Sequence, residues 1–462
     1  MVIKMIKAGF VGFGEVNTPK DIIVKKCRDA LENFEKQGVS AVSVYPVTDD
    51  YEEKDIAHAL DVLKKEDFDC LVLCIAGWIP THAVIKIAEH YRHKPMVLWG
   101  LCGWMEDGRL VTTADQAGTS ALRKTMCDLG YNFKYIYDII GLPSRADRVA
   151  AYCRAASAAD RLRHARVGMA GYRDMNLYGT QADGPSLKRS IGPEIETFEL
   201  LEVFQRSERV SDDEKRSVVN AVKEGGKVDG KEIKAWNFLS EPSDEGLMKA
   251  AGYYIAVDQL IKERGYDAIS LKDVDGMKKL LGFPPAPVFM LLSDISGVCT
   301  IPENDCLGNV TQLMVKYITG QAAAYLEFYE FFSDRVLAGV PDYVPAEVTE
   351  SGVVAMPAAF GALSEGILNV SKVKPGTVTV CRLAQVDGKY VMHMVKGHGV
   401  TPRRWEEAGW TQPAPQLPGL EIVLDDAEDF AEKVMCQHYI ISYGDNTKEI
   451  GMLCDLLGIK II

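Results

Sequence analysis

Short apolar runs alternate with amphipathic segments through the first third of the chain. The runs are rich in β-branched and aliphatic residues, which is typical of buried strands in a parallel sheet. They occupy residues 8–13, 39–44, 70–76, 95–101 and 135–140. Helices are predicted between them, from residue 18 onward and at residues 56–63, 82–90 and 120–129. Because this alternation favours a doubly wound sheet with right-handed crossovers, we expect a flavodoxin-like α/β domain over residues 1–143.

A second α/β domain is predicted over residues 144–340. An alanine-rich helix at residues 144–163 leads into it, and apolar runs at 166–172, 266–271 and 288–292 predict strands. Strands and helices alternate here as they do in the first domain, so we expect this domain to be doubly wound as well.

A helix with clear end signals follows the predicted strand at 288–292. Asn304 or Asp305 can cap its first turn, because a short polar side chain accepts hydrogen bonds from the free N–H groups there. Gly320 closes the helix, since glycine suits the left-handed position after a helix C-terminus. A further strand is predicted at 322–328.

Two carboxylates flank this helix. Glu303 precedes it, and Glu327 lies inside the apolar run after it. We expect both at the ends of adjacent parallel strands, where ligands gather in α/β sheets. A carboxylate in an apolar strand is costly to bury unless it is paired, protonated or bound to a metal. The alternative is that Glu327 marks the end of its strand and reaches water.

The last part of the chain predicts a β-rich domain over residues 341–462. Prolines punctuate short strands, and Asp387-Gly388 between apolar runs at 377–383 and 390–395 is a hairpin signal. We therefore expect a small barrel, with a late strand at 438–442 lying between two helices.

An imidazole joins the two carboxylates as a candidate ligand. His438 begins the late strand of otherwise aromatic and aliphatic residues. Two carboxylates and one imidazole suit a divalent metal ion and leave positions open for a sugar diol and water. Glu303, Glu327 and His438 are therefore the candidate metal ligands.

The order of these motifs resembles the L-fucose/L-arabinose isomerase family. The chain has E-x-D at 303–305, a helix ending in Thr319-Gly320, an acidic residue 24 positions after Glu303, and His438 followed by Tyr443-Gly444-Asp445. The resemblance implies a manganese-dependent ketol isomerase that interconverts aldoses and ketoses. It implies that Glu303 and Glu327 both bind Mn²⁺ and move the proton, with neutral His438 as the third ligand.

The resemblance also implies an assembly and further substrate contacts. Members of the family form trimers or hexamers with active sites at subunit boundaries, and a tryptophan of the first domain reaches the neighbouring site. Trp78 is the position that matches it. Arg173 lies where the family has a turn after a similar strand, so it is a candidate contact to a sugar hydroxyl, with a surface ion pair as the alternative.

Three differences from the pattern of the fucose and arabinose isomerases predict that the chain is a divergent member of that family. Glu327 is arabinose-isomerase-like, since fucose isomerases have Asp at that position. Arabinose isomerases have a second metal-binding His shortly afterwards, whereas this chain has no His between residues 165 and 392. Lys272-Asp273-Val274 stands where members of the family have Cys-Trp. We expect an open-chain pentose or a deoxy- or substituted hexose as substrate, without a particular sugar being identified.

Composition narrows the class of protein. The 462 residues carry a net charge of −13, which argues against sequence-independent nucleic-acid binding and gives no basic patch for an anionic membrane. The glycine-rich start is unlike a signal peptide, and no apolar stretch is long enough to span a membrane. Eleven cysteines without framework spacing indicate reduced thiols. We therefore expect a cytoplasmic protein.

Two other functions remain as alternatives. The turn Gly12-Phe13-Gly14 invites a dinucleotide site and an NAD-linked oxidoreductase, but Asn17 replaces the third glycine and the next strand ends in Tyr45-Pro46 rather than in an acid. A non-catalytic sugar-binding protein with two α/β lobes is the other alternative.

Overall fold

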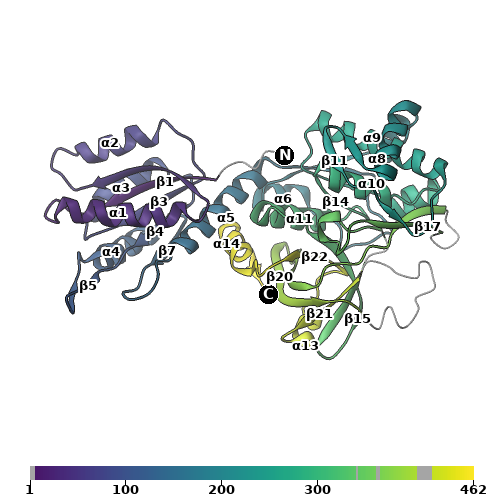
Figure 1. The fold of residues 1–462 in the computed structure, drawn as a ribbon. Helices are drawn as coiled ribbons and strands as arrows, with labels where there is room; N and C mark the ends of the chain where they lie inside the picture. The colour runs from purple at the N-terminus through teal and green to yellow at the C-terminus, as the bar shows by residue number, and fades with distance from the viewer. Residues whose placement is uncertain (1–5, 340–341, 360–364, 403–418) are drawn as a thin grey trace. The chain divides into compact units, whose positions relative to one another are not determined.

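The structure, a computed structural model, describes residues 6–339, 342–359, 365–402 and 419–462. Contacts divide the chain into two compact units, Met1–Asp160 and Arg161–Ile462. The fold is mixed α/β, with parallel sheets and a closed C-terminal barrel (Figure 1). The finer division at residues 143 and 340 stays a prediction.

The first unit contains a five-stranded sheet in which every pairing is parallel. Its strands, in spatial order, are β2 (Ser40–Val47), β1 (Lys7–Phe13), β3 (Cys70–Ile75), β4 (Met96–Gly100) and β7 (Phe133–Tyr137). The helices are α1 (Lys20–Glu35), α2 (Lys54–Leu63), α3 (Thr81–His90) and α4 (Asp115–Asp128), and a small hairpin is formed by β5 (Trp104–Glu106) and β6 (Arg109–Val111). The predicted alternation of strands and helices is confirmed.

The glycines of the first turn have a packing role. A Cβ atom at Gly12 would overlap the Sγ atom of Cys27 on α1, and one at Gly14 would overlap the side chain of Ile23 on the same helix. Both glycines therefore let α1 approach β1 closely.

The second unit begins with a four-stranded parallel sheet. Its order is β14 (Cys299–Ile301), β13 (Ala268–Leu271), β8 (Arg166–Ala170) and β9 (Glu194–Phe198). Its helical segments are α5 (Ala146–His164), which crosses the unit boundary, α6 (Gly184–Ser190), α7 (Leu200–Ser207), α8 (Asp212–Glu224), α9 (Asp244–Arg264), the π-helical η1 (Asp273–Lys278), α10 (Ala286–Leu291), the π-helical η2 (Leu292–Ser296) and α11 (Cys306–Thr319).

The predicted strand at 288–292 is wrong, because this run forms α10 and the start of η2. A short apolar run has no periodicity that separates a buried helix from a buried strand. Pro287 in the first turn favours the helix, since its fixed φ suits that position. The strand that leads to Glu303 is instead the three-residue β14.

Six antiparallel strands close the C-terminal barrel. They follow one another in the order β19 (Gly376–Val386), β22 (His438–Tyr443), β15 (Ala324–Phe331), β16 (Arg335–Gly339), β21 (Gly419–Leu424) and β20 (Lys389–Val400), and β19 pairs with β20 to complete the ring. The predicted hairpin at Asp387-Gly388 is confirmed, and both of its residues have positive φ, as a two-residue turn of this kind requires.

Smaller elements complete the second unit. They are β10 (Gly226–Val228) paired with β11 (Lys231–Ile233), a sheet of β12 (Asn237–Phe238), β17 (Val354–Ala359) and β18 (Glu365–Asn369), the 3₁₀ turn η3 (Ala346–Val348), α13 (Ala427–Glu432), α14 (Thr447–Leu457) and β23 (Lys460–Ile461), which pairs with β20. No helix among the described residues is long and apolar enough to cross a membrane.

Helix α11 joins the parallel sheet to the barrel. It contacts β13 and β14 of the parallel sheet and β19 and β22 of the barrel. Its first and last turns are as predicted, with Asp305 as the N-cap and Gly320 in the left-handed conformation after the C-terminus. The expectation that 322–328 is a neighbouring strand of the same parallel sheet is wrong, because β15 belongs to the barrel.

Candidate functional site

Glu327 and His438 are direct partners on neighbouring barrel strands. Antiparallel pairing of β15 with β22 places the two residues opposite each other. Opposite residues project from the same face of a sheet. The Oε2 atom of Glu327 accordingly lies 3.9 Å from Nε2 of His438.

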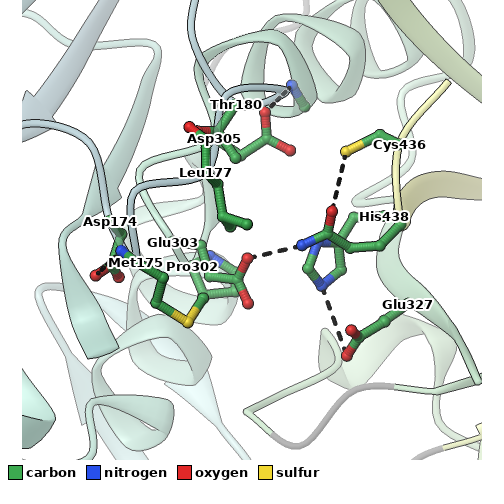
Figure 2. A network of polar contacts seen from close by, with 12 residues as sticks. Asp174, Met175, Leu177, Thr180, Pro302, Glu303, Asp305, Glu327, Cys436 and His438 are labelled. Carbon is green, nitrogen blue, oxygen red and sulfur yellow. Dashed lines mark hydrogen bonds and ion pairs between the residues drawn. The ribbon is translucent and has the colours of Figure 1, made fainter. Parts of the chain in front are cut away.

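Glu303 reaches the same imidazole from the parallel sheet. It follows β14 in a left-handed turn, in which φ is +64° at Glu303 and +50° at Asn304. Its Oε2 atom lies 3.6 Å from Nδ1 of His438. Figure 2 shows the imidazole with Glu303 beside one ring nitrogen and Glu327 beside the other. The structure thus brings the three candidate ligands together from two sheets.

Burial keeps the imidazole neutral. His438 is 1% exposed, and its ring stacks on Tyr325 with the ring centroids 4.4 Å apart. Burial lowers the pKa of His438 to about 3, because a charged imidazole would lose its hydration. A neutral imidazole is the form that binds a metal or accepts a proton.

Acidic groups crowd around Glu303. Burial, aided by the charges of Asp273 and Asp342, raises the pKa of its carboxyl to about 10. Burial and the charge of Asp342 also raise the pKa of Glu327. Lys278 pairs with both aspartates, its Nζ lying 3.0 Å from Asp273 Oδ2 and 2.7 Å from Asp342 Oδ1. Four carboxylates therefore share this region with one ammonium group.

Side chains tie together the loops at the carboxyl ends of the parallel strands. The carboxylate of Asp174 accepts hydrogen bonds from the backbone N–H groups of Val274 and Asp275 at 2.9 and 2.8 Å. The amide of Asn304 donates to the carbonyls of Ala170 and Tyr172 at 3.1 and 2.7 Å. These bonds link the segments after β8, β13 and β14 at the edge of the sheet where Glu303 lies.

The donor atoms fit a divalent cation in type and in burial. Glu303 Oε2 and His438 Nδ1 are buried and have no hydrogen-bond partner within the described structure. An excess of carboxylates over ammonium groups in a buried region favours a bound cation. Oxygen and imidazole donors together suit Mn²⁺.

The three side chains do not surround one point in their present orientations. No three His, Cys, Asp or Glu side chains of residues 6–339, 342–359, 365–402 and 419–462 are arranged as ligands of one ion. The reason is that Glu303 and Glu327 face different nitrogens of His438. The side chain of Glu327 is 32% exposed, which gives it more freedom than Glu303, at 12%.

The two candidate substrate residues lie in different units. Trp78, in the first unit, is 39% exposed, and its backbone N–H donates to Thr113. Arg173, in the second unit, donates from Nη2 to Asn176 Oδ1 at 3.2 Å, and its guanidinium lies 4.7 Å from the ring centroid of Tyr178. Arg173 and Asn304 line a cavity of about 70 Å³ at the carboxyl ends of β8 and β14.

A larger cavity lies elsewhere in the second unit. It has a volume of about 820 Å³, and β11, η2 and residues 346–353 contribute to its walls. None of the three candidate ligands lines it. Its walls carry charged side chains of both signs. By contrast, Glu303 and Glu327 both approach one buried imidazole, so His438 with its two carboxylates is the better candidate site.

The ionic cluster of Asp273, Lys278 and Asp342 near Glu303 is only weakly marked in the sequence. Asp273 carries a usable signal, since it stands just after the apolar run that forms β13. Lys278 and Asp342 carry none, because a lysine beside Lys279 and an aspartate after a proline are typical of surface residues, and both become buried only in the fold.

Neither a scan against protein-family models nor a search of curated protein sequences found a match to this chain. The function proposed below therefore rests on the residues and their geometry.

Proposed function

We propose that the chain is a metal-dependent aldose–ketose isomerase acting on an open-chain pentose or on a deoxy- or substituted hexose. The observation that carries this proposal is the approach of two carboxylates, from two different sheets, to the two nitrogens of one buried imidazole. The order of these residues along the chain, which resembles that of the fucose and arabinose isomerases, supports it.

Glu303, Glu327 and His438 would hold Mn²⁺ or another divalent cation. Their donor types suit it, and Glu303 Oε2 and His438 Nδ1 are buried atoms without hydrogen-bond partners in the described part of the chain. When bound, the cation would polarise the sugar carbonyl and the neighbouring hydroxyl.

The carboxyl groups would move the proton. Isomerisation transfers a proton between C1 and C2 through a cis-enediol, and an acid/base group must face each carbon. Burial raises the pKa of Glu303 to about 10, so its carboxyl holds a proton at neutral pH when no cation is near. Burial also raises the pKa of Glu327. Neutral His438 lies between the two and keeps them on opposite sides of its ring.

The remaining features of the proposal concern assembly and architecture. A homo-oligomer, trimeric or hexameric, would let Trp78 of one subunit contribute to a neighbouring site. Both α/β domains would be doubly wound, with the strand order β2-β1-β3-β4-β7 of the first unit in support. The chain would act in the cytoplasm on a small sugar. Light scattering tests the oligomeric state.

The test is a panel of pentoses, 6-deoxyhexoses and 6-substituted hexoses, assayed for ketose formation with and without added Mn²⁺. We expect conversion of at least one sugar only with the metal, and about one Mn²⁺ per chain after purification. Glu303→Gln should lose the activity, whereas Glu330→Gln, which changes an exposed residue of β15, should keep it. Sugar binding without conversion would indicate a binding protein, and binding of NAD(H) would indicate an oxidoreductase.

A further inference from the structure

The turn that carries Glu303 is strained and needs support. Two successive residues other than glycine, Glu303 and Asn304, have left-handed φ values of +64° and +50°. Such conformations are disfavoured for L-residues and persist only where surrounding contacts hold them. The backbone N–H of Asn304 donates to the Leu271 carbonyl at 3.2 Å, which holds the second residue of the turn.

Asp273 holds the first residue of the turn. Its Oδ1 atom accepts a hydrogen bond from the backbone N–H of Glu303 at 2.7 Å. Asp273 is fully buried and Glu303 is half-buried, so this bond is partly shielded from water. Without Asp273 the same N–H would be a partly buried donor without this acceptor, which is destabilising.

Lys278 in turn holds Asp273. Both residues lie in the π-helical segment η1 (Asp273–Lys278), whose wider turn places the first and last residues side by side. Lys278 is 1% exposed and also pairs with Asp342 from the segment after β16. Short π-helical segments are frequent at functional sites. This one follows β13, the parallel strand that pairs with β14.

We propose that Asp273, fixed by Lys278, is the positioning residue that sets the turn at Glu303 and thereby directs the Glu303 carboxylate toward His438. The inference rests on the proposed function in so far as Glu303 binds the metal. In this proposal Asp273 positions the Glu303 side chain through the backbone of that residue and is not itself a ligand of the metal ion.

A matched pair of variants separates this hydrogen bond from the charge of Asp273. Asp273→Asn and Asp273→Ala both remove the charge, but only the asparagine keeps an oxygen that can accept the Glu303 N–H. Lys278 keeps Asp342 as its partner in both variants, so neither leaves the ammonium group unpaired. Circular dichroism and urea midpoints would verify that both variants fold.

Mn²⁺ titration of the full chain by calorimetry is the first measurement. We expect Asp273→Ala to bind Mn²⁺ at least about tenfold more weakly than Asp273→Asn, the size of effect that supporting residues of metal sites commonly have. Lys278→Arg, which keeps a cation beside Asp273, should bind more tightly than Asp273→Ala. Equal affinities of the two Asp273 variants would overturn the proposal.

Amide hydrogen exchange separates this proposal from the proposed function. Absence of Mn²⁺ binding by the wild-type chain would contradict the metal-dependent isomerase, yet the turn can still be tested without metal. We expect the peptide that contains the Glu303 amide to exchange at least about tenfold faster in Asp273→Ala than in Asp273→Asn, because the alanine offers no acceptor. Equal exchange rates would show that Asp273 does not hold the turn.

Discussion

Asp305 and Arg382 form a bidentate ion pair in the interior of the second unit. Arg382 Nη2 lies 2.8 Å from Asp305 Oδ1, Nη1 contacts Oδ2, and both residues are at most 1% exposed. The same carboxylate caps α11 through the Gly308 N–H and accepts the Tyr325 hydroxyl at 2.9 Å. Because Tyr325 stacks on His438, this pair connects the start of α11 with the barrel strands that carry the site.

The first prediction concerns the stability that this pair provides. Arg382→Met should lower the free energy of unfolding by about 3–5 kcal/mol, because it leaves the buried carboxylate of Asp305 without its cation. Urea denaturation measures the change. Lys433→Met removes a solvent-exposed ion pair with Asp429 and should leave the urea midpoint nearly unchanged. An unchanged midpoint for Arg382→Met would show that the pair does not stabilise the fold.

The second prediction concerns the imidazole as a metal ligand. His438→Gln should weaken Mn²⁺ binding by about 100-fold or more, since loss of a direct ligand exceeds the effect of losing a supporting residue. Calorimetric titration measures it. His398→Gln changes an exposed histidine of the same barrel and serves as the control, with an affinity close to that of the wild-type chain. Equal losses in both variants would remove His438 from the ligand set.

The third prediction concerns proton transfer by Glu327. Glu327→Gln should lower kcat for ketose formation by about 10²–10⁴-fold, because an amide cannot carry the proton between carbons. Glu327→Asp keeps a carboxylate and should retain more activity than the glutamine variant. Glu330→Gln, on the exposed side of the same strand, should have wild-type kcat. Comparable kcat values for all three variants would exclude a role of Glu327 in the reaction.

The fourth prediction concerns acid stability through His393. This residue is 1% exposed, and its Nδ1 lies 2.6 Å from the Tyr439 hydroxyl. Burial, aided by the charge of Lys433, lowers its pKa from 6.5 to about 4. Above pH 6.5 the imidazole is mostly neutral in both the folded and the unfolded chain. Below that pH the unfolded chain takes up a proton that the folded chain does not, so the free energy of unfolding falls as pH drops toward 4.

The expected loss from His393 is about 3 kcal/mol between pH 7 and pH 4. Urea denaturation across this range measures it. The His393→Gln variant can still accept a hydrogen bond from the Tyr439 hydroxyl, but it does not titrate in this range. Its free energy of unfolding should therefore fall by about 3 kcal/mol less between pH 7 and pH 4 than that of the wild-type chain. His398→Gln should keep the wild-type slope. Parallel curves for His393→Gln and the wild-type chain would contradict the prediction.

Local signals in the sequence were sufficient for the elements whose ends are chemically marked. Asp305 and Gly320 mark the two ends of α11, and Asp387-Gly388 forms the turn between β19 and β20. These signals are readable because capping and positive φ depend on residues only a few positions apart. The run at 288–292 lacked such a marker, and its assignment as a strand was wrong. Burial on all sides removes the alternation that distinguishes the two structures.

The sequence by itself determined the parallel α/β sheets, the barrel hairpin and the choice of Glu303, Glu327 and His438 as candidate ligands. Only the tertiary structure decided that Glu327 lies on a barrel strand, that the two carboxylates face opposite nitrogens of His438, and which charges support them. These contacts join residues far apart in the chain. Burial then fixes the protonation of the groups involved, since desolvation depends on everything packed around a side chain and not on its neighbours in sequence.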